Sequence, residues 1–539
     1  MVFSTPNRLA ALALAVSSIG FSRAEPQKSF GPTLESAREN GLQIFNSVHD
    51  AMRQFGSSLH HNGMSLYPAV IPKGVLLYHG THTKEIPTGF EWLAFEIEHA
   101  EGFARGGPPG PNGTHGNPPP GPPPMGMAMQ DDHPPPNNRP PRPRGEGHLH
   151  IYQAVRPLNV LYIDGMAAGK TDIGTVDTQD ILLAGNKSHS PWGESSRAEN
   201  LCSLAQQWKI DGFIRMEPGF EIIYCDFTDG LRLVSANKRP SMDQPGSEDN
   251  AISGFEWARA ASQRYHGIGS SRVILDYSSV VSAFFYPINL TNPDPKRPEL
   301  PRLLGASNEE MDVVREHVAE SIARSISHMQ TPIDWQGVSD MIVTRYDKRL
   351  PLIAETGSID LLKAEINGLL NIYIDYAEAD NGLAGAQQRC TEFFLQPVQP
   401  RTSEDKLIYA AFENTTATIC AALFKVRELI IENTDADESE AIHATRQIIS
   451  SLMKSLSWSN WKDCGVCKAD EVCFIAMWPM GDTEDHYNPR CLNYTAMAHG
   501  RNSYWRSSGG FPHGPPPQLM ACADEETCEE HGDLGSEEL

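Results

Sequence analysis

The stretch GVLLYHGT, residues 74–81, decides how the N-terminal part of the chain is interpreted. Its leucines, valine and tyrosine end at a glycine, a composition typical of a short strand followed by a turn. His79 and Gly80 stand at the end of this strand. Runs of the same kind occur at 149–155, 159–164, 212–216 and 221–227, so we expect one sheet that contains all five segments.

One of these runs continues into the glycine-rich sequence VLYIDGMAAGKT, residues 160–171. A phosphate-binding loop needs four residues between its first glycine and the Gly-Lys pair, because the loop must wrap around a phosphate. Gly165 and Gly169 enclose only Met166, Ala167 and Ala168. The sequence therefore predicts a strand followed by a glycine turn, and no nucleotide hydrolysis.

Helical patterns lie between and after these strands. Residues 96–105 and 195–208 place apolar side chains at helical spacing, so we expect an α+β domain over residues 25–234. A polar, proline-containing linker follows at 235–250. From 251 to 458 the pattern is mainly helical, and Val314, Val318, Ile322 and Ile326 form one apolar stripe.

Residues 106–146 are dominated by proline and glycine. Such a segment buries too little apolar surface to pack, so we predict a disordered insertion. Because strand patterns stand on both sides of it, we place the insertion inside the α+β domain.

The first 24 residues predict a secretory signal peptide, since an apolar run follows Arg8 and small residues end at Ala24. No later segment has the length and apolarity of a membrane span. We therefore expect a secreted protein without a stable membrane anchor. Residues 529–539 form an acidic tail whose last four residues loosely resemble a retrieval signal, which leaves the lumen of the endoplasmic reticulum as the alternative location.

An even number of cysteines in a secreted chain predicts disulfides. Six of the ten fall in a predicted disulfide-rich module at 459–528; a zinc ribbon at Cys464-x-x-Cys467 would lack its second ligand pair. Five Asn-x-Ser/Thr sequons predict glycosylation. The cysteines are Cys202, Cys225, Cys390, Cys420, Cys464, Cys467, Cys473, Cys491, Cys522 and Cys528, and the sequons begin at Asn112, Asn186, Asn289, Asn414 and Asn493.

The formal net charge of the chain is −24. A surface this negative repels phosphate backbones and anionic lipids, so we expect no nucleic-acid partner. A protein or glycan partner is compatible with this charge, but the sequence does not identify one. With its signal peptide, sequons and proline-rich insertion, the chain also looks like the large secreted proteins of filamentous fungi.

The segments GVLLYHGT, EWLAFEIEHAEGFAR and EIIYCDF together resemble the ADP-ribosyltransferase superfamily over about residues 70–230. The resemblance implies a split sheet with a histidine, an aromatic residue and a glutamate on three strands. It implies that His79, with Trp92 or Phe95, binds the cofactor NAD, and that Glu221 is catalytic. A carboxylate there would stabilise the positive charge that develops when the nicotinamide bond breaks.

The sequence departs from that family in three ways. A tryptophan or phenylalanine replaces the tyrosine of the second strand, and Gly219 stands where arginine-modifying members carry a second acid. The large insertion also falls between the second and third elements. The residues also have ordinary structural interpretations: His79 as a hydrogen-bonded strand residue, Glu221 as an ion-pair partner of Arg215, and the aromatic residues as core.

Two hypotheses of different class follow. The first is a secreted glycoprotein that acts as a non-catalytic interaction protein. The alternative is an NAD-dependent ADP-ribosyltransferase or NAD glycohydrolase. No other catalytic set and no metal site is predicted, because neither a serine-hydrolase elbow nor a zinc-binding helix motif occurs.

Overall fold

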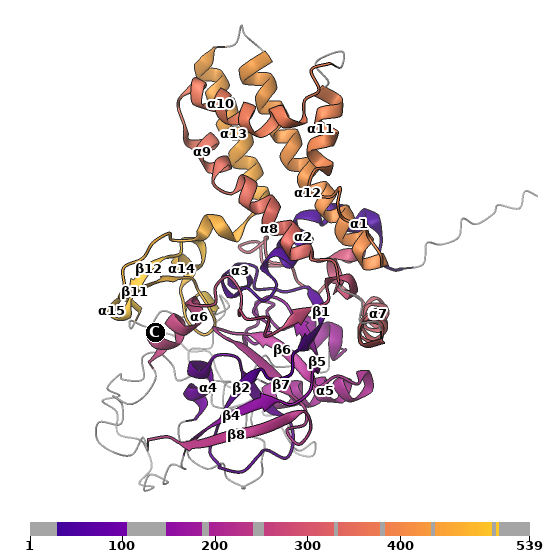
Figure 1. Cartoon of the computed structure of the whole chain (residues 1–539), viewed down its shortest axis with the longest axis vertical. Helices are drawn as coiled ribbons and strands as arrows, with labels where there is room; N and C mark the ends of the chain where they lie inside the picture. The colour runs from indigo at the N-terminus through magenta and orange to yellow at the C-terminus, as the bar shows by residue number, and fades with distance from the viewer. Residues whose placement is uncertain are drawn as a thin grey trace, which may run out of the picture.

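The computed structural model describes residues 30–104, 147–185, 193–240, 253–327, 332–377, 383–432, 437–497 and 503–505. Figure 1 shows a lower body that contains a sheet, from which a group of long helices rises. The predicted signal peptide, the insertion at 106–146, the acidic tail, Cys522, Cys528, Asn112 and Asn186 lie outside the described residues.

A ten-stranded mixed sheet forms the body, in the order β10-β1-β5-β6-β7-β3-β2-β4-β8, with β9 also pairing with β1. Only β5 and β6 run parallel; the other pairs described are antiparallel. The strands are β1 (Ser65–Ile71), β2 (Leu76–Thr81), β3 (Glu91–Ala94), β4 (His148–Ala154), β5 (Leu158–Ile163), β6 (Gly212–Met216), β7 (Phe220–Tyr224), β8 (Leu231–Lys238), β9 (Ile274–Leu275) and β10 (Val281–Ser282).

The five strands predicted from sequence are confirmed as β2, β4, β5, β6 and β7. The sheet is larger than predicted at both of its ends. Strand β8 extends into the expected linker, and β9 and β10 come from the region expected to be helical. Strands of two residues are too short to show an alternating pattern, so pattern analysis does not find β9 and β10.

Helices cover the sheet. Helix α4 packs on β2 and β3, while α5 packs on β6 and β7. Both confirm the helices expected near 96–105 and 195–208. The helices of the body are α1 (Leu34–Glu39), α2 (Gly41–Asp50), α3 (Gln54–Leu59), α4 (Ile97–Phe103), η1 (Thr178–Leu183), α5 (Glu194–Trp208) and α6 (Gly254–Ser262), with the short turns η3 (Tyr277–Ser279) and η4 (Ala283–Phe285).

The mainly helical region is confirmed beyond β10. In α7, Val314, Val318 and Ile322 are buried, whereas Ile326, near the end of the helix, is 40% exposed. The helices are α7 (Asn308–Ser327), α8 (Trp335–Tyr346), α9 (Arg349–Glu355), α10 (Ile359–Leu370), η5 (Asn371–Tyr373), α11 (Leu383–Glu392), α12 (Ser403–Arg427), η7 (Glu428–Glu432) and α13 (Glu438–Leu456).

One stretch of this region, Ser403–Ile431, has the length and composition of a membrane span, with a mean hydropathy of 1.3 in its most apolar window. The sequence analysis expected no such segment after the signal peptide, and for length and composition that expectation is wrong. More than half of that window, 56%, is buried inside the protein, because α12 packs against α1, α2, α11 and α13. Its apolar composition is therefore that of a central core helix.

The C-terminal segment is stapled by disulfides, as predicted. Cys464 pairs with Cys473 and Cys467 with Cys491, around β11 (Glu471–Phe474) and β12 (Arg490–Asn493). The remaining elements are η8 (Ser459–Lys462), α14 (Thr483–Tyr487), α15 (Tyr494–Met497) and η9 (Ser503–Trp505). Core residues of this segment belong to the same apolar cluster as those of the sheet and the helices. The segment thus packs on the body and shares its core.

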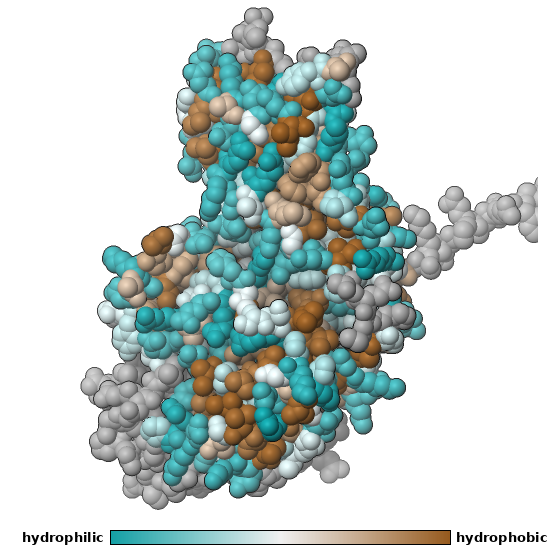
Figure 2. Space-filling view, viewed as in Figure 1, coloured by the Kyte–Doolittle hydropathy of each residue, from teal (hydrophilic) through white to brown (hydrophobic). Residues whose placement is uncertain are grey.

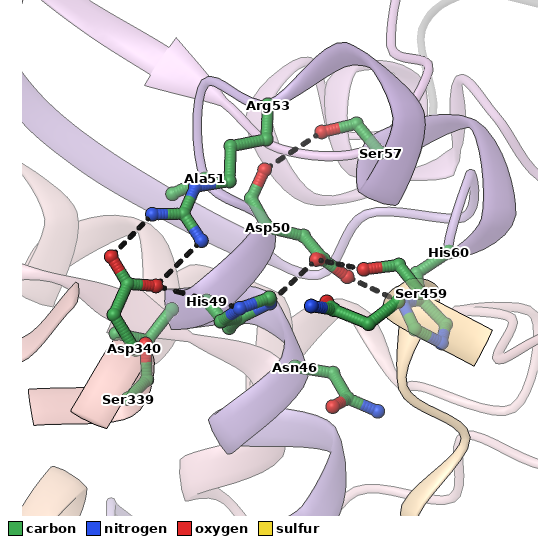
Figure 3. A network of polar contacts seen from close by, with 12 residues as sticks. Asn46, His49, Asp50, Ala51, Arg53, Ser57, His60, Ser339, Asp340 and Ser459 are labelled. Carbon is green, nitrogen blue, oxygen red and sulfur yellow. Dashed lines mark hydrogen bonds and ion pairs between the residues drawn. The ribbon is translucent and has the colours of Figure 1, made fainter. Parts of the chain in front are cut away.

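A buried polar network centred on Asp50 joins three distant parts of the chain (Figure 3). The Asp50 carboxylate lies 3.0 Å from His49 Nδ1 and 2.7 Å from His60 Nδ1, and accepts a hydrogen bond from Ser459 Oγ at 3.0 Å. Arg53 donates two bonds of 2.7 Å to Asp340 of α8. The network connects the N-terminal helices to the helical region and to the C-terminal segment.

Polar residues cover much of the face drawn in Figure 2, while apolar residues gather over the sheet end of the body. Leu76 and Val234, on β2 and β8, are among the exposed apolar side chains.

Candidate functional site

The candidate site lies where β2 and β3 separate. These neighbouring strands share one register pair, Tyr78 with Ala94, whereas β2 pairs with β4 along its whole length. His79 Nδ1 lies 2.7 Å from the carbonyl oxygen of Trp92 and bridges the gap. The missing backbone pairing leaves space for a pocket between the two strands.

His79, Trp92 and Glu221 all line this pocket, whose cavity volume is about 40 Å³. That volume holds roughly three water molecules. Phe95, the second aromatic candidate, does not line it: the ring is fully buried, and Arg272 lies 5.4 Å from the ring centroid. Other side chains around the pocket are Tyr78, Glu91, His99, Phe103, Lys170 and Glu194.

His79 enters the pocket from the opposite face of the sheet to Glu221. Directly opposed residues of antiparallel strands point to the same side, and side chains alternate along a strand. The pairs Tyr78–Ala94 and Ala94–Glu221 therefore place Tyr78 with Glu221, and His79 on the other side, where its ring lies 5.4 Å from Phe227. Both residues reach the pocket because it runs through the gap between the strands.

The protonation state of His79 is set by its surroundings. Burial disfavours the charged ring and lowers the pKa of His79 to about 4. Because a carbonyl accepts from Nδ1, the proton lies on Nδ1, and Nε2 carries a lone pair. Nε2 is buried without a hydrogen-bond partner in the described part of the chain. The pocket therefore contains an unused acceptor.

Glu221 forms an ion pair with Arg215, the residue directly opposite on β6. Burial alone would raise the pKa of Glu221, but the positive charge of Arg215 outweighs it and lowers the pKa. Arg215 also pairs with Glu194, and Arg197 joins Glu194 to Asp180 through contacts of 2.7 Å. The structural interpretation of Glu221 as an ion-pair residue is confirmed, and its carboxylate is ionised.

A second carboxylate, that of Glu217, lies beside Glu221. His99 Nε2 is 3.5 Å from Glu217 and 3.8 Å from Glu221. Sequence analysis found no paired acid, since it examined position 219. A Cβ atom at Gly219 would approach Glu96 at 2.8 Å and His99 at 3.1 Å, so an acid there would have to displace the Glu96 carboxylate. The second acid of the pair is therefore Glu217, four residues before Glu221.

His99, Glu217 and Glu221 have the spacing of metal ligands, with their donor atoms within 4.8 Å of one another. Trp257 Nε1, however, lies 3.1 Å from His99 Nδ1. An indole N–H only donates, so Nδ1 is the acceptor and the proton of the neutral imidazole is on Nε2. A protonated Nε2 does not bind a metal, and it points toward the two carboxylates instead.

Burial alone would lower the pKa of His99, but Glu221, Glu217 and Glu96 outweigh burial and raise it. The neutral and the charged ring both carry a proton on Nε2, which points toward these carboxylates at ion-pair distance.

Lys170, from the glycine-rich stretch 160–171, faces the same carboxylates. Its ammonium is 3.3 Å from Glu217 and lies over the ring of Trp478 at 4.7 Å from the centroid. The turn begins at Gly165, whose φ of +69° favours glycine. The predicted strand and glycine turn are confirmed, and the lysine neutralises buried acids.

Glu91, the first residue of β3, also lines the pocket and was missed by sequence analysis. Burial raises the pKa of its carboxyl to about 7. Within the described residues Glu91 has no ion-pair partner. A single acid at the start of a strand has no sequence signature, so only the fold reveals it.

The remaining predicted sites are cysteines and glycosylation sequons. Two further disulfides, Cys202–Cys225 and Cys390–Cys420, join α5 to the segment after β7 and α11 to α12. The side chain of Asn289 is exposed, whereas Asn414 on α12 and Asn493 on β12 are half-buried. Glycosylation at these positions stays a prediction.

Comparison with known proteins places the pocket in a shared domain. A domain family described as the YPL277C N-terminal domain matches residues 34–246, which include every residue that lines the pocket. The chain is 29% identical over 544 residues to the uncharacterized protein YOR389W of Saccharomyces cerevisiae, covering 83% of each chain. It is 31% identical to the uncharacterized yeast protein YPL277C over 400 residues, 61% of this chain and 77% of the relative. No solved structure matches the chain significantly.

Proposed function

The chain belongs to the family of the yeast protein YPL277C, and from the pocket in its shared domain we propose that it binds NAD and cleaves the bond between nicotinamide and ribose. The observation that carries this proposal is the meeting of His79, Trp92 and Glu221, from three adjacent strands, around one pocket. Their order along the chain is that of the ADP-ribosyltransferase superfamily.

The charge of the pocket supports this chemistry. When the glycosidic bond breaks, its electron pair moves to the pyridinium nitrogen, nicotinamide leaves uncharged, and positive charge develops on the ribose. The ionised Glu221 would stabilise that charge. A water or another nucleophile then adds to the ribose carbon and loses a proton, which completes hydrolysis or transfer.

Substrate entry requires rearrangement, because a cavity of about 40 Å³ does not hold a nicotinamide ring. Trp92 and Phe103 line the pocket, and their side chains would have to move apart. Glu221 would exchange part of its contact with Arg215 for the substrate, while Arg215 stays neutralised by Glu194. The proposal thus demands a pocket that opens on binding.

A second candidate is a non-catalytic interaction protein with a protein or glycan partner. The ion pair of Glu221 with Arg215, and the position of His79 on the other face of the sheet, favour it. In that case the buried charges stabilise the fold. For both candidates we propose a secreted glycoprotein, or one in the lumen of the endoplasmic reticulum, in keeping with the four disulfides among the described residues.

One experiment separates the two candidates. Secreted protein is incubated with NAD, and released nicotinamide is separated and quantified, for wild type and Glu221→Gln. The matched control is Glu256→Gln, a change of an exposed acid on α6. Nicotinamide release that is lost in Glu221→Gln and kept in Glu256→Gln supports the enzyme. No release by the wild type, with or without an added protein acceptor, leaves the interaction protein.

A further inference from the structure

Some of the acids around the pocket form an ion pair with an arginine or a lysine, and one does not. Glu221 and Glu194 share Arg215, and Glu217 is matched by Lys170. Glu91 has no such partner among the described residues. When its carboxyl is ionised, the pocket therefore carries a negative charge that nothing in the described protein balances.

The rest of the lining suits a flat ligand. Tyr78, Trp92 and Phe103 supply aromatic surface, which attracts cations and stacks on planar rings. His79 Nε2 adds a buried lone pair without a partner, which is an acceptor for an N–H or O–H of the ligand. A ligand that meets all three features has a planar ring, a positive charge and one hydrogen-bond donor. It must reach through the gap between β2 and β3, because the strand registers place Glu91 and His79 on the face opposite to Tyr78 and Trp92.

We infer that Glu91 makes this pocket selective for aromatic rings with a fixed positive charge, such as an N-substituted pyridinium carboxamide. The inference rests on the proposed function and deepens it, because the oxidised form of NAD carries this ring and nicotinamide itself does not carry the charge. Glu91 would hold the ring before cleavage and lose its attraction once the ring leaves uncharged. The pocket would thus release its own product.

The pH dependence of binding follows from the position of Glu91. Because burial raises its pKa to about 7, Glu91 is neutral below that pH and charged above it. Tyr152 of β4 and Tyr224 of β7 lie beside it with raised pKa values and stay neutral. The other ionisable groups that face the pocket are His79, His99, Lys170, Glu194 and Glu221.

Of these, the pKa of His79 is lowered to about 4, and those of His99 and Lys170 are raised. The pKa values of Glu194 and Glu221 are lowered. Affinity for the cation should therefore rise as the pH passes through about 7. Because the pKa of His99 is also raised from its ordinary value, the Glu91→Gln variant decides which of the two groups causes the change.

Equilibrium binding of two small probes tests this inference without any catalysis. The probes are the N-methylnicotinamide cation and neutral nicotinamide, which differ in charge and share the ring and the carboxamide. At about pH 8.5, which is above the pKa of Glu91, the carboxyl is ionised. The wild type should then bind the cation about tenfold more tightly than the neutral probe. At about pH 5.5 that preference should shrink to the part that the aromatic rings and the ionised Glu221 supply.

Glu91→Gln keeps the size of the side chain and should show only this smaller preference at either pH. Glu85→Gln changes a fully exposed acid of the neighbouring loop and should behave as wild type. Thermal unfolding checks that both variants are folded, and Glu91→Asp should retain part of the preference.

Equal preference in wild type and Glu91→Gln, or no binding of either probe by the wild type, would overturn the inference. Cation binding that depends on Glu91 without nicotinamide release from NAD supports the inference and contradicts the proposed function.

Discussion

Arg215 and Glu221 are directly opposed residues of β6 and β7, and their side chains form a buried ion pair at the floor of the pocket. The same guanidinium pairs with Glu194 of α5. One cation thus holds two acids from two elements beneath the pocket. The placement of Glu221 depends on Arg215, and so does any chemistry that Glu221 performs.

Replacement of Arg215 should destabilise the fold strongly. Arg215→Met leaves Glu194 and Glu221 buried without their shared cation, and breaking such a pair typically costs about 3 to 5 kcal/mol. Urea unfolding of the secreted protein measures the loss. Arg259→Met removes the exposed pair with Glu256 and should change the free energy of unfolding by less than about 1 kcal/mol. Equal effects of the two changes would show that the buried network contributes little.

The Asp50 network in Figure 3 should lose stability in acid. Burial alone would raise the pKa of Asp50, but hydrogen bonds from His49 and His60 outweigh it and hold the pKa well below its usual range. A pKa lower in the folded than in the unfolded chain means that the stabilisation is present above about pH 4 and is lost as the pH falls further.

Asp50→Asn tests this expectation. The melting temperature of the variant should lie below that of the wild type at neutral pH, and the difference should shrink at about pH 3. A difference that is independent of pH would mean that packing, and not the charge of Asp50, explains the effect.

The C-terminal disulfides should pair as Cys464–Cys473 and Cys467–Cys491. Mass spectrometry of unreduced peptides should find these two links. The double replacement Cys467→Ser with Cys491→Ser should lower stability by about 2 to 4 kcal/mol, since it frees the chain between them. A link from Cys464 to Cys467, or free thiols at these positions, would contradict the arrangement.

Glycosylation should occur at Asn289, whose side chain is exposed in a loop. Glycan removal by an endoglycosidase should shift the mobility of the secreted wild type. The shift should be smaller for Asn289→Gln by the size of one glycan. An identical shift in both proteins would show that this sequon is not used.

Sequence patterns predicted the parts of the fold that repeat along the chain. The strands around His79 and Glu221 show as short apolar runs bounded by turn residues, and the stripe on α7 shows as apolar residues at helical spacing; a sequence displays both directly. The sheet edge formed by β9 and β10 depends on pairing with β1, more than 200 residues earlier, and two residues carry no period.

The candidate site was predicted in part. His79, Trp92 and Glu221 were identified through the resemblance to the ADP-ribosyltransferase superfamily, and they line one pocket. Glu91, His99 and Glu217 were not, because their importance comes from what surrounds them. The tautomer of His99, for example, depends on Trp257, which lies 158 residues further along the chain. Phe95 illustrates the converse error, since an aromatic residue that follows a strand is indistinguishable from core in the sequence.

The most direct test of the account is the rate of nicotinamide release from NAD by the secreted wild-type protein and by Glu221→Gln. The substitution preserves shape and removes the charge that would stabilise the developing cation, so release should fall at least about a hundredfold. The control Glu256→Gln should keep the wild-type rate. Equal release by wild type and Glu221→Gln, or no release by the folded wild type, would contradict the claim that Glu221 carries out glycosidic bond cleavage in this pocket.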